Sequence, residues 1–207
     1  MRLGLLGPAE GNVGGLGRAA ELLIDVLKVE RAVYLGNDGA LDEAVAALAT
    51  RVVGSDPTDD AAWSRAAKVA LTGSYAEIDA FVRKERARQR LKVLEGLPRG
   101  GDARTMEMIG DRVAVLLYDK ASLDEEDIFA ASLLVYGKSP EPLVKKVGNR
   151  WFVTPGSIGS AGGGVGILDD GAEEIVASVY ALDGSRTLVE TVAVARAAKM
   201  KIQGGSA

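Results

Sequence analysis

The first residues of the chain pass from an apolar run into a turn. Leu3, Leu5 and Leu6 predict a buried strand, and Gly7-Pro8 ends it because proline has no N–H group to donate to a neighbouring strand. The next apolar positions have the spacing of one helix face: Ala19, Leu22, Leu23, Val26 and Leu27. The loop 7–17 therefore lies between the carboxyl end of a strand and the start of a helix, where ligands bind in open α/β sheets.

Strands and helices alternate through the rest of the first half. Residues 31–35 predict a second strand, which the turn Gly36-Asn37-Asp38-Gly39 closes. The longest helix is expected at 75–94, and its second half, from Arg83 to Lys92, is strongly basic. Further expected elements are a helix at 41–49, a brief strand at 52–53, a capped helical turn around Trp63, a strand at 68–71 and a loop at 96–104. This alternation predicts a largely parallel sheet.

Strands dominate the second half. Gly110-Asp111 and Gly148-Asn149 each predict a hairpin, and a helix at 122–131 is expected to be capped by Ser122, with Glu125 completing a capping box. Strands are expected at 105–109, 112–118, 133–136, 143–147, 151–154, 165–168, 174–180 and 186–194, with a turn at 169–171 and a flexible loop at 155–164. The order predicts a mixed α/β fold, a two-sheet β-sandwich flanked by helices, as one domain over 1–194 with a short helical tail over 195–207.

Composition narrows the classes of function. The 207-residue chain carries a net charge of −4, which gives no overall attraction to nucleic acid or to an anionic membrane. No apolar stretch is long enough to span a membrane and the N-terminus has no signal-peptide anatomy, so we expect a cytoplasmic protein. The chain has no cysteine and no histidine, which removes thiolate and imidazole metal ligands and the usual general base.

Glycine-rich turns follow the predicted strands in a fixed order. They are Gly7-Pro8-Ala9-Glu10-Gly11-Asn12, Gly36-Asn37, Gly73-Ser74-Tyr75-Ala76, the strand end at Tyr118, Gly137-Lys138-Ser139-Pro140 and Thr154-Pro155-Gly156-Ser157. In this order the turns resemble those of the calcineurin-like metallophosphoesterase superfamily, in particular its small bacterial and archaeal phosphodiesterase branch. The resemblance covers nearly the whole chain and implies that family's fold.

The same resemblance implies that the metal ligands of the family are replaced. The ligand positions carry Pro8, Glu10, Asn37, Ser74, Tyr118, Lys138 and Pro140, and Asn12 and Asp38 complete the degenerate pocket. A two-metal site needs several anionic or imidazole ligands, which proline, tyrosine and lysine cannot replace at neutral pH. We therefore assign no catalytic and no metal-binding residue, and we expect no cofactor.

The leading hypothesis is a catalytically inactive member of the superfamily that acts as a protein-binding scaffold or regulatory subunit. The resemblance supplies a precedent, because the phosphoesterase-fold subunit of retromer is an assembly component. The partner is a protein of unspecified identity, and a homodimer is also a candidate because symmetric pairs are the commonest oligomers.

Two alternatives stay open. In the first, Glu10, Asp38 and Asp119 form a rebuilt carboxylate site for one hard cation in a phosphodiesterase. In the second, the protein is a regulatory binder of a phosphorylated small molecule or nucleotide, held by the loop 11–17 and by Lys138. Arg83, Arg86 and Arg90 share one helix face and are further candidate contacts for an anion or an acidic partner.

Overall fold

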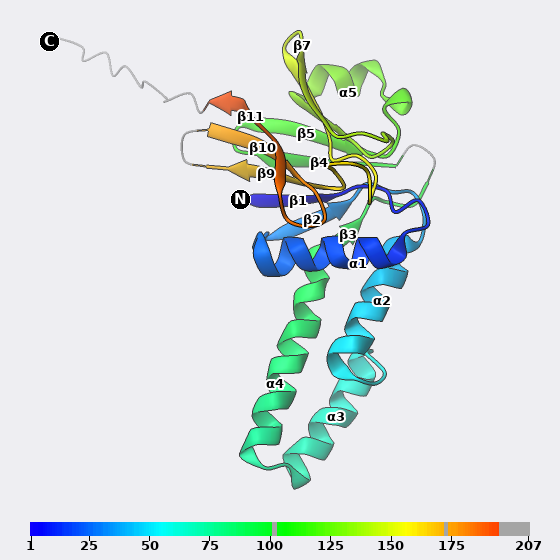
Figure 1. Ribbon diagram of the computed structural model, residues 1–207, viewed down its shortest axis with the longest axis vertical. Helices are drawn as coiled ribbons and strands as arrows, with labels where there is room; N and C mark the ends of the chain where they lie inside the picture. The colour runs from blue at the N-terminus through cyan, green and yellow to red at the C-terminus, as the bar shows by residue number, and fades with distance from the viewer. Residues whose placement is uncertain (101–102, 172–173, 195–207) are drawn as a thin grey trace, which may run out of the picture.

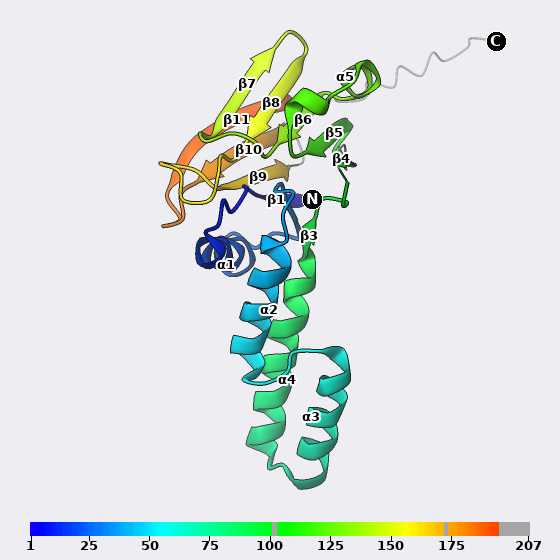
Figure 2. The ribbon, with the colours of Figure 1, turned by 90° about the vertical axis from the view of Figure 1, so that its right-hand side faces the viewer.

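The computed structural model describes residues 1–100, 103–171 and 174–194, and the predicted tail at 195–207 lies outside these residues. Two sheets pack face to face, with helices against the outer side of the first sheet (Figures 1 and 2). The predicted mixed α/β sandwich is therefore confirmed. In the described part of the chain, no helix combines the length and apolarity that crossing a membrane requires.

The first sheet has the strand order β11-β10-β9-β1-β2-β3. Its strands are β1 (Arg2–Leu6), β2 (Arg31–Tyr34), β3 (Leu94–Gly96), β9 (Val165–Asp170), β10 (Glu174–Tyr180) and β11 (Arg186–Val194). β1, β2 and β3 run parallel to one another, with Leu6 in register with Tyr34 and Tyr34 with Gly96. β9, β10 and β11 are antiparallel to their neighbours, so the sheet is parallel only in the half that the first strands build.

The second sheet has the strand order β4-β5-β6-β8-β7. Its strands are β4 (Arg104–Ile109), β5 (Arg112–Leu117), β6 (Leu133–Tyr136), β7 (Leu143–Val147) and β8 (Arg150–Thr154). β5, β6 and β8 are parallel, and β4 and β7 close the sheet as antiparallel hairpin partners. Both predicted hairpins are confirmed.

The core lies in two main layers that follow the alternation of side chains along each strand. Leu3 and Leu5 of β1 point between the sheets and pack with Val33, Leu116 and Val153. The opposite face of the first sheet packs against α1 (Val13–Glu21), its π-helical continuation Leu22–Val26, and α2 (Ala40–Val53). A smaller cluster on the outer side of the second sheet packs under the segment that contains the 3-10 turn Lys120–Ser122 and α5 (Glu125–Ala130).

A pair of helices, α3 (Asp59–Thr72) and α4 (Tyr75–Arg90), extends away from the sandwich (Figure 1). We call these two helices the helical arm. α3 has no buried residue, and Arg88 is the one buried residue of α4. Two ion pairs join the helices: Glu85 of α4 pairs with Arg65 of α3 at 2.7 Å, and Arg88 of α4 pairs with Asp59 of α3 at 2.8 Å. Within α4, Glu85 also pairs with Arg88 at 2.7 Å.

The two short strands predicted in this region, at 52–53 and 68–71, are helical in the structure. Residues 68–71 are helical because Thr58 caps an alanine-rich segment that favours helix along its whole length. Residues 52–53 end α2, which stops at Gly54 in the left-handed conformation (φ 75°). The long helix ends early, at Arg90, and after a 3-10 turn at Leu91–Val93 the chain enters β3, which the sequence pattern did not predict.

Three smaller expectations are also wrong. Val26 is 67% exposed, because the π-helical turn shifts it off the buried face. Asp124 caps α5 and Asp127 completes the capping box, so Ser122 and Glu125 do not have these roles. Asp169 and Asp170 belong to β9 and pair with β10, so they do not form a turn.

Candidate functional site

The loops that follow the parallel strands of both sheets meet at one edge of the sandwich. The two sheets approach closely there: a Cβ atom on Gly7 would lie 1.8 Å from the Gly156 carbonyl oxygen, and one on Gly137 would lie 2.1 Å from that of Leu35. Only glycine fits at such positions. The Ile158 N–H group also donates to the Pro8 carbonyl at 2.8 Å, which joins the loop after β1 to the loop after β8.

Tyr34 links the first two loops through its hydroxyl group. The side chain is 1% exposed, and its oxygen accepts a hydrogen bond from the Ala9 N–H group at 2.9 Å. The hydroxyl donates in turn to Asp38 Oδ1 at 2.8 Å, which also accepts from the Ala40 N–H group at 3.2 Å. Burial raises the pKa of Tyr34 well above its ordinary value, so the hydroxyl stays protonated and able to donate.

Lys138 and Asp119 form an ion pair where β5 and β6 end. The Lys138 N–H group donates to the Tyr118 carbonyl at 2.7 Å, and Asp119 Oδ1 accepts from the Ala121 N–H group at 3.0 Å. The pair lowers the pKa of Asp119 and raises that of Lys138, so both groups are charged at neutral pH. A positively charged ammonium group thus lies among the loops that follow the strands of the second sheet.

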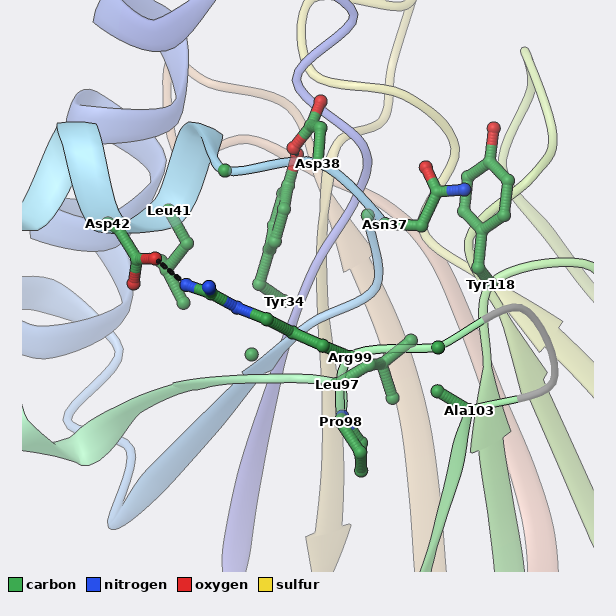
Figure 3. A pocket seen from close by; sticks show the side chains of 14 residues that line it. Tyr34, Asn37, Asp38, Leu41, Asp42, Leu97, Pro98, Arg99, Ala103 and Tyr118 are labelled. Atoms are coloured by element: carbon green, nitrogen blue, oxygen red, sulfur yellow. Dashed lines mark hydrogen bonds and ion pairs between the residues drawn. The ribbon is translucent and has the colours of Figure 1, made fainter.

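A cavity of about 540 Å³ opens beside these loops (Figure 3). Tyr34, Asn37, Asp38 and Tyr118 line it together with the segment that follows β3. The side chain of Arg99, in that segment, extends along the cavity wall and pairs with Asp42 of α2 at 2.8 Å. The cavity has the size of a small-ligand site.

No protein-family model matches the sequence, and no curated protein is similar to it. Solved structures are similar to it in fold. Vacuolar protein sorting 29 from Cryptosporidium parvum has a TM-score of 0.50 at 14% identity, covering 91% of this chain and 95% of that one. A predicted phosphoesterase from Streptococcus pneumoniae has a TM-score of 0.49 at 12% identity, covering 92% and 97%. The zinc complex of Vps29 from Entamoeba histolytica has a TM-score of 0.47 at 14% identity, covering 93% and 100%.

This chain has the calcineurin-like metallophosphoesterase fold. The metallophosphoesterase fold implies two metal ions at the carboxyl ends of the strands. Whether this chain could bind them depends on which side-chain donors lie at that edge. Asp38 is engaged by Tyr34 and Ala40, Asp119 by Lys138 and Ala121, and Glu10 is exposed in a left-handed turn (φ 49°).

The residues at this edge do not fit the two metals of the metallophosphoesterase fold. Within residues 1–100, 103–171 and 174–194, no three acidic side chains come together as metal ligands would. Glu10, Asp38 and Asp119 are thus not gathered into the rebuilt carboxylate site that the sequence left open. A divalent cation needs several oxygen or nitrogen donors with free lone pairs at one point, and this arrangement does not supply them.

The structure brings most of the predicted pocket residues to this edge. Pro8, Asn37, Asp38, Tyr118 and Lys138 all lie in or beside the loops described above. Asn12 instead caps α1, where its side-chain oxygen accepts from the Gly15 N–H group at 2.9 Å. Pro140 is exposed in the loop before β7.

The match of Gly73–Ala76 to the third family turn is wrong. Ser74 caps α4 at the tip of the helical arm, in a capping box with Glu77, and does not reach the site. The segment before it is helical, so the turn joins two helices and follows no strand. The third loop is Gly96-Leu97-Pro98-Arg99, after β3. Its signal in the sequence is the pair Gly96 and Pro98, because these residue types typically mark a turn or loop, here shortly after Val93 and Leu94.

The basic helix face is not part of the site. Arg83 pairs with Asp79 at 2.6 Å, and Arg90 pairs with Asp25 at 3.2 Å while donating to the Ile24 carbonyl at 2.7 Å. Arg86 is exposed on the same helix. All three belong to the helical arm, whereas Lys138 follows β6, so these cations do not converge on one anion.

Proposed function

We propose that this protein is a non-catalytic phosphoesterase-fold protein that acts as a protein-binding scaffold or regulatory subunit in the cytoplasm. One observation carries the proposal: at the edge where the loops of both sheets meet, the Tyr34 hydroxyl and the charged groups Asp38, Asp119 and Lys138 are bound to partners within the chain. The Tyr34 hydroxyl joins the loops after β1 and β2 through Ala9 and Asp38, and the Lys138–Asp119 pair joins those after β5 and β6.

Exposed aromatic side chains support the binding role. Trp63 is 78% exposed, Tyr75 is 94% exposed and Phe129 is 88% exposed. Large exposed aromatic side chains are typical anchors of protein interfaces, because each buries a large area on binding. Vacuolar protein sorting 29, which has the same fold, is by its name a protein of vacuolar sorting, and its likeness in fold agrees with a role other than hydrolysis.

The alternative of a phosphorylated small ligand is less well supported. Among the described residues, the cavity is lined by the carboxylates Asp38 and Asp42 and by the cation Arg99, which is paired with Asp42. Lys138 is likewise paired, with Asp119. An anion entering this cavity would meet uncompensated negative charge, which opposes binding.

Metal content and phosphodiester hydrolysis test the proposal together. The full chain, purified without chelator, is analysed by inductively coupled plasma mass spectrometry and assayed with bis-p-nitrophenyl phosphate and Mn²⁺. We expect metal well below one equivalent and no hydrolysis beyond that of Mn²⁺ alone. Stoichiometric metal with turnover would overturn the proposal.

A variant identifies the source of any hydrolysis that appears. Glu10→Ala/Asp119→Ala removes two of the carboxylates nearest the site and leaves the core untouched. If turnover falls with this variant, the chain has a carboxylate metal site and is an enzyme. If turnover is the same in both proteins, Glu10 and Asp119 do not form the metal site, and the hydrolysis has another source.

A further inference from the structure

The helical arm carries an apolar groove that no other element of the chain fills in the described residues. It has a volume of about 340 Å³ and lies between α3 and α4 beside the end of α2. Its walls are Val53, Val69, Ala80 and Phe81. We call this feature the arm groove. It is large enough to take an aromatic side chain, the residue type that gains most from burial.

The rim of the arm groove is positively charged. Lys68 of α3 and Lys84 of α4 both line it and are exposed, and the described residues include no ion pair to either. Among the other charged residues there, Glu85 accepts from Arg65 at 2.7 Å and from Arg88 at 2.7 Å, and Glu77 is a charged carboxylate that accepts from the neutral Ser74 N–H group at 2.7 Å. Cations still outnumber carboxylates along the lining of the groove, with Arg65, Lys68 and Lys84 against Glu77 and Glu85. An occupant with an apolar tip and flanking carboxylates would therefore match the groove.

α5 has this chemistry. Phe129 is 88% exposed, which is unusual for a phenylalanine outside an interface. Glu125 and Glu126 precede it by four and three residues, so all three side chains share one face of the helix. Both glutamates are exposed, and among the described residues neither forms an ion pair, because Arg104 binds Asp124 and Asp127 instead. We call Glu125, Glu126 and Phe129 the acidic knob.

The two surfaces cannot meet within one molecule. The arm groove lies near the free end of the helical arm, and α5 lies beyond the second sheet at the opposite end of the molecule (Figures 1 and 2). We infer that the acidic knob of one copy docks in the arm groove of a second copy, with Phe129 between the groove walls and Glu125 and Glu126 beside Lys68 and Lys84.

Such a contact joins two different surfaces, so it is head-to-tail. Each copy in a pair keeps one free groove and one free knob, and the contact therefore propagates into open chains or closes into rings. One aromatic anchor with two ion pairs is a small interface, so we expect a dissociation constant of roughly 10–100 μM. The inference does not depend on the proposed function, because both surfaces lie away from the edge at which the loops of the two sheets meet.

Sedimentation velocity of the full chain tests the association. We expect the mass to rise beyond the monomer as the concentration approaches about 100 μM, and to fall again when salt screens the ion pairs. Phe129→Ala should weaken association at least about tenfold, while Val26→Ala, which truncates another exposed apolar side chain away from both surfaces, should leave it unchanged. A chain that is monomeric over the whole range overturns the inference.

Mixing two variants distinguishes a head-to-tail contact from a symmetric dimer. Phe129→Ala keeps the groove, and Lys68→Glu/Lys84→Glu keeps the knob, so neither should associate alone but a mixture should form a pair that grows no further. Lys68→Ala/Lys84→Ala serves the same purpose without added carboxylates, and circular dichroism checks that its helices are intact. Association that survives in each variant alone, or a mixture that stays monomeric, contradicts the inference.

Discussion

At the scale of single residues, Tyr34 is the side chain on which the site depends most. Its hydroxyl satisfies the buried Ala9 N–H group and donates to Asp38, so it holds two loops that have no other shared partner among the hydrogen bonds of the described residues. We predict that Tyr34→Phe lowers the free energy of unfolding by about 1–3 kcal/mol, because the Ala9 N–H group loses its acceptor while still buried. Urea denaturation measures the loss.

Tyr118→Phe is the matched control for this residue. Tyr118 lines the same cavity and is only half-buried, and none of the hydrogen bonds of the described residues involves its hydroxyl group. Its replacement should change the free energy of unfolding by less than about 0.5 kcal/mol. Equal losses in the two variants would show that the Tyr34 hydroxyl does not link the loops.

At the scale of elements, the helical arm is held by charge more than by apolar burial. Arg88 is 7% exposed and joins the start of α3 to α4, because it pairs with Asp59 and Glu85 and donates to the Pro57 carbonyl at 2.8 Å. We predict that Arg88→Ala destabilises the arm by about 3 kcal/mol, since Glu85 is left half-buried with one partner fewer. Hydrogen exchange should show faster amide exchange within 59–90, with the sandwich unchanged.

Lys92 provides the comparison for Arg88. It pairs with the same Asp59 at 3.1 Å, but both of these side chains are well exposed. An exposed ion pair contributes little, so Lys92→Ala should cost less than about 1 kcal/mol. If both variants exchange alike, burial of Arg88 is not what stabilises the arm.

At the scale of the whole molecule, the two sheets are fixed relative to each other where their backbones touch. Gly7 lies against the Gly156 carbonyl with no room for a Cβ atom, and the Gly7 N–H group donates to the Gly164 carbonyl at 2.9 Å. We predict that Gly7→Ala lowers the free energy of unfolding by about 3 kcal/mol, because the added methyl group forces the loops apart. The midpoint of chemical denaturation should fall accordingly.

Gly14→Ala separates this steric effect from the general effect of replacing glycine. Gly14 lies in α1, and a Cβ atom there would have nothing within 4 Å. Alanine favours helix over glycine, so this variant should gain about 0.5–1 kcal/mol. A loss at Gly14, or no loss at Gly7, would show that close approach of the two sheets is not the cause.

The sequence predicted the sandwich and most of its strands because side-chain alternation marks a strand whose two faces meet different layers. Leu3 and Leu5 face the second sheet while Leu6 and Tyr34 face the helices, and the turns Gly110-Asp111 and Gly148-Asn149 fix the hairpins. These signals are local, so they can be read without knowing what packs against them. The same holds for the glycines where the two sheets meet.

Tertiary structure alone decided which short apolar runs became strands and which groups face one another. Residues 68–71 and Leu94–Gly96 are both short, and a short run suits helix or strand until a neighbour selects one. The open edge of β2 selects Leu94–Gly96 as β3, which moves the third loop of the site from Ser74 to Gly96–Arg99. The partners Tyr34–Asp38, Lys138–Asp119 and Arg88–Glu85 likewise exist only because packing fixes distances that the order of residues leaves free.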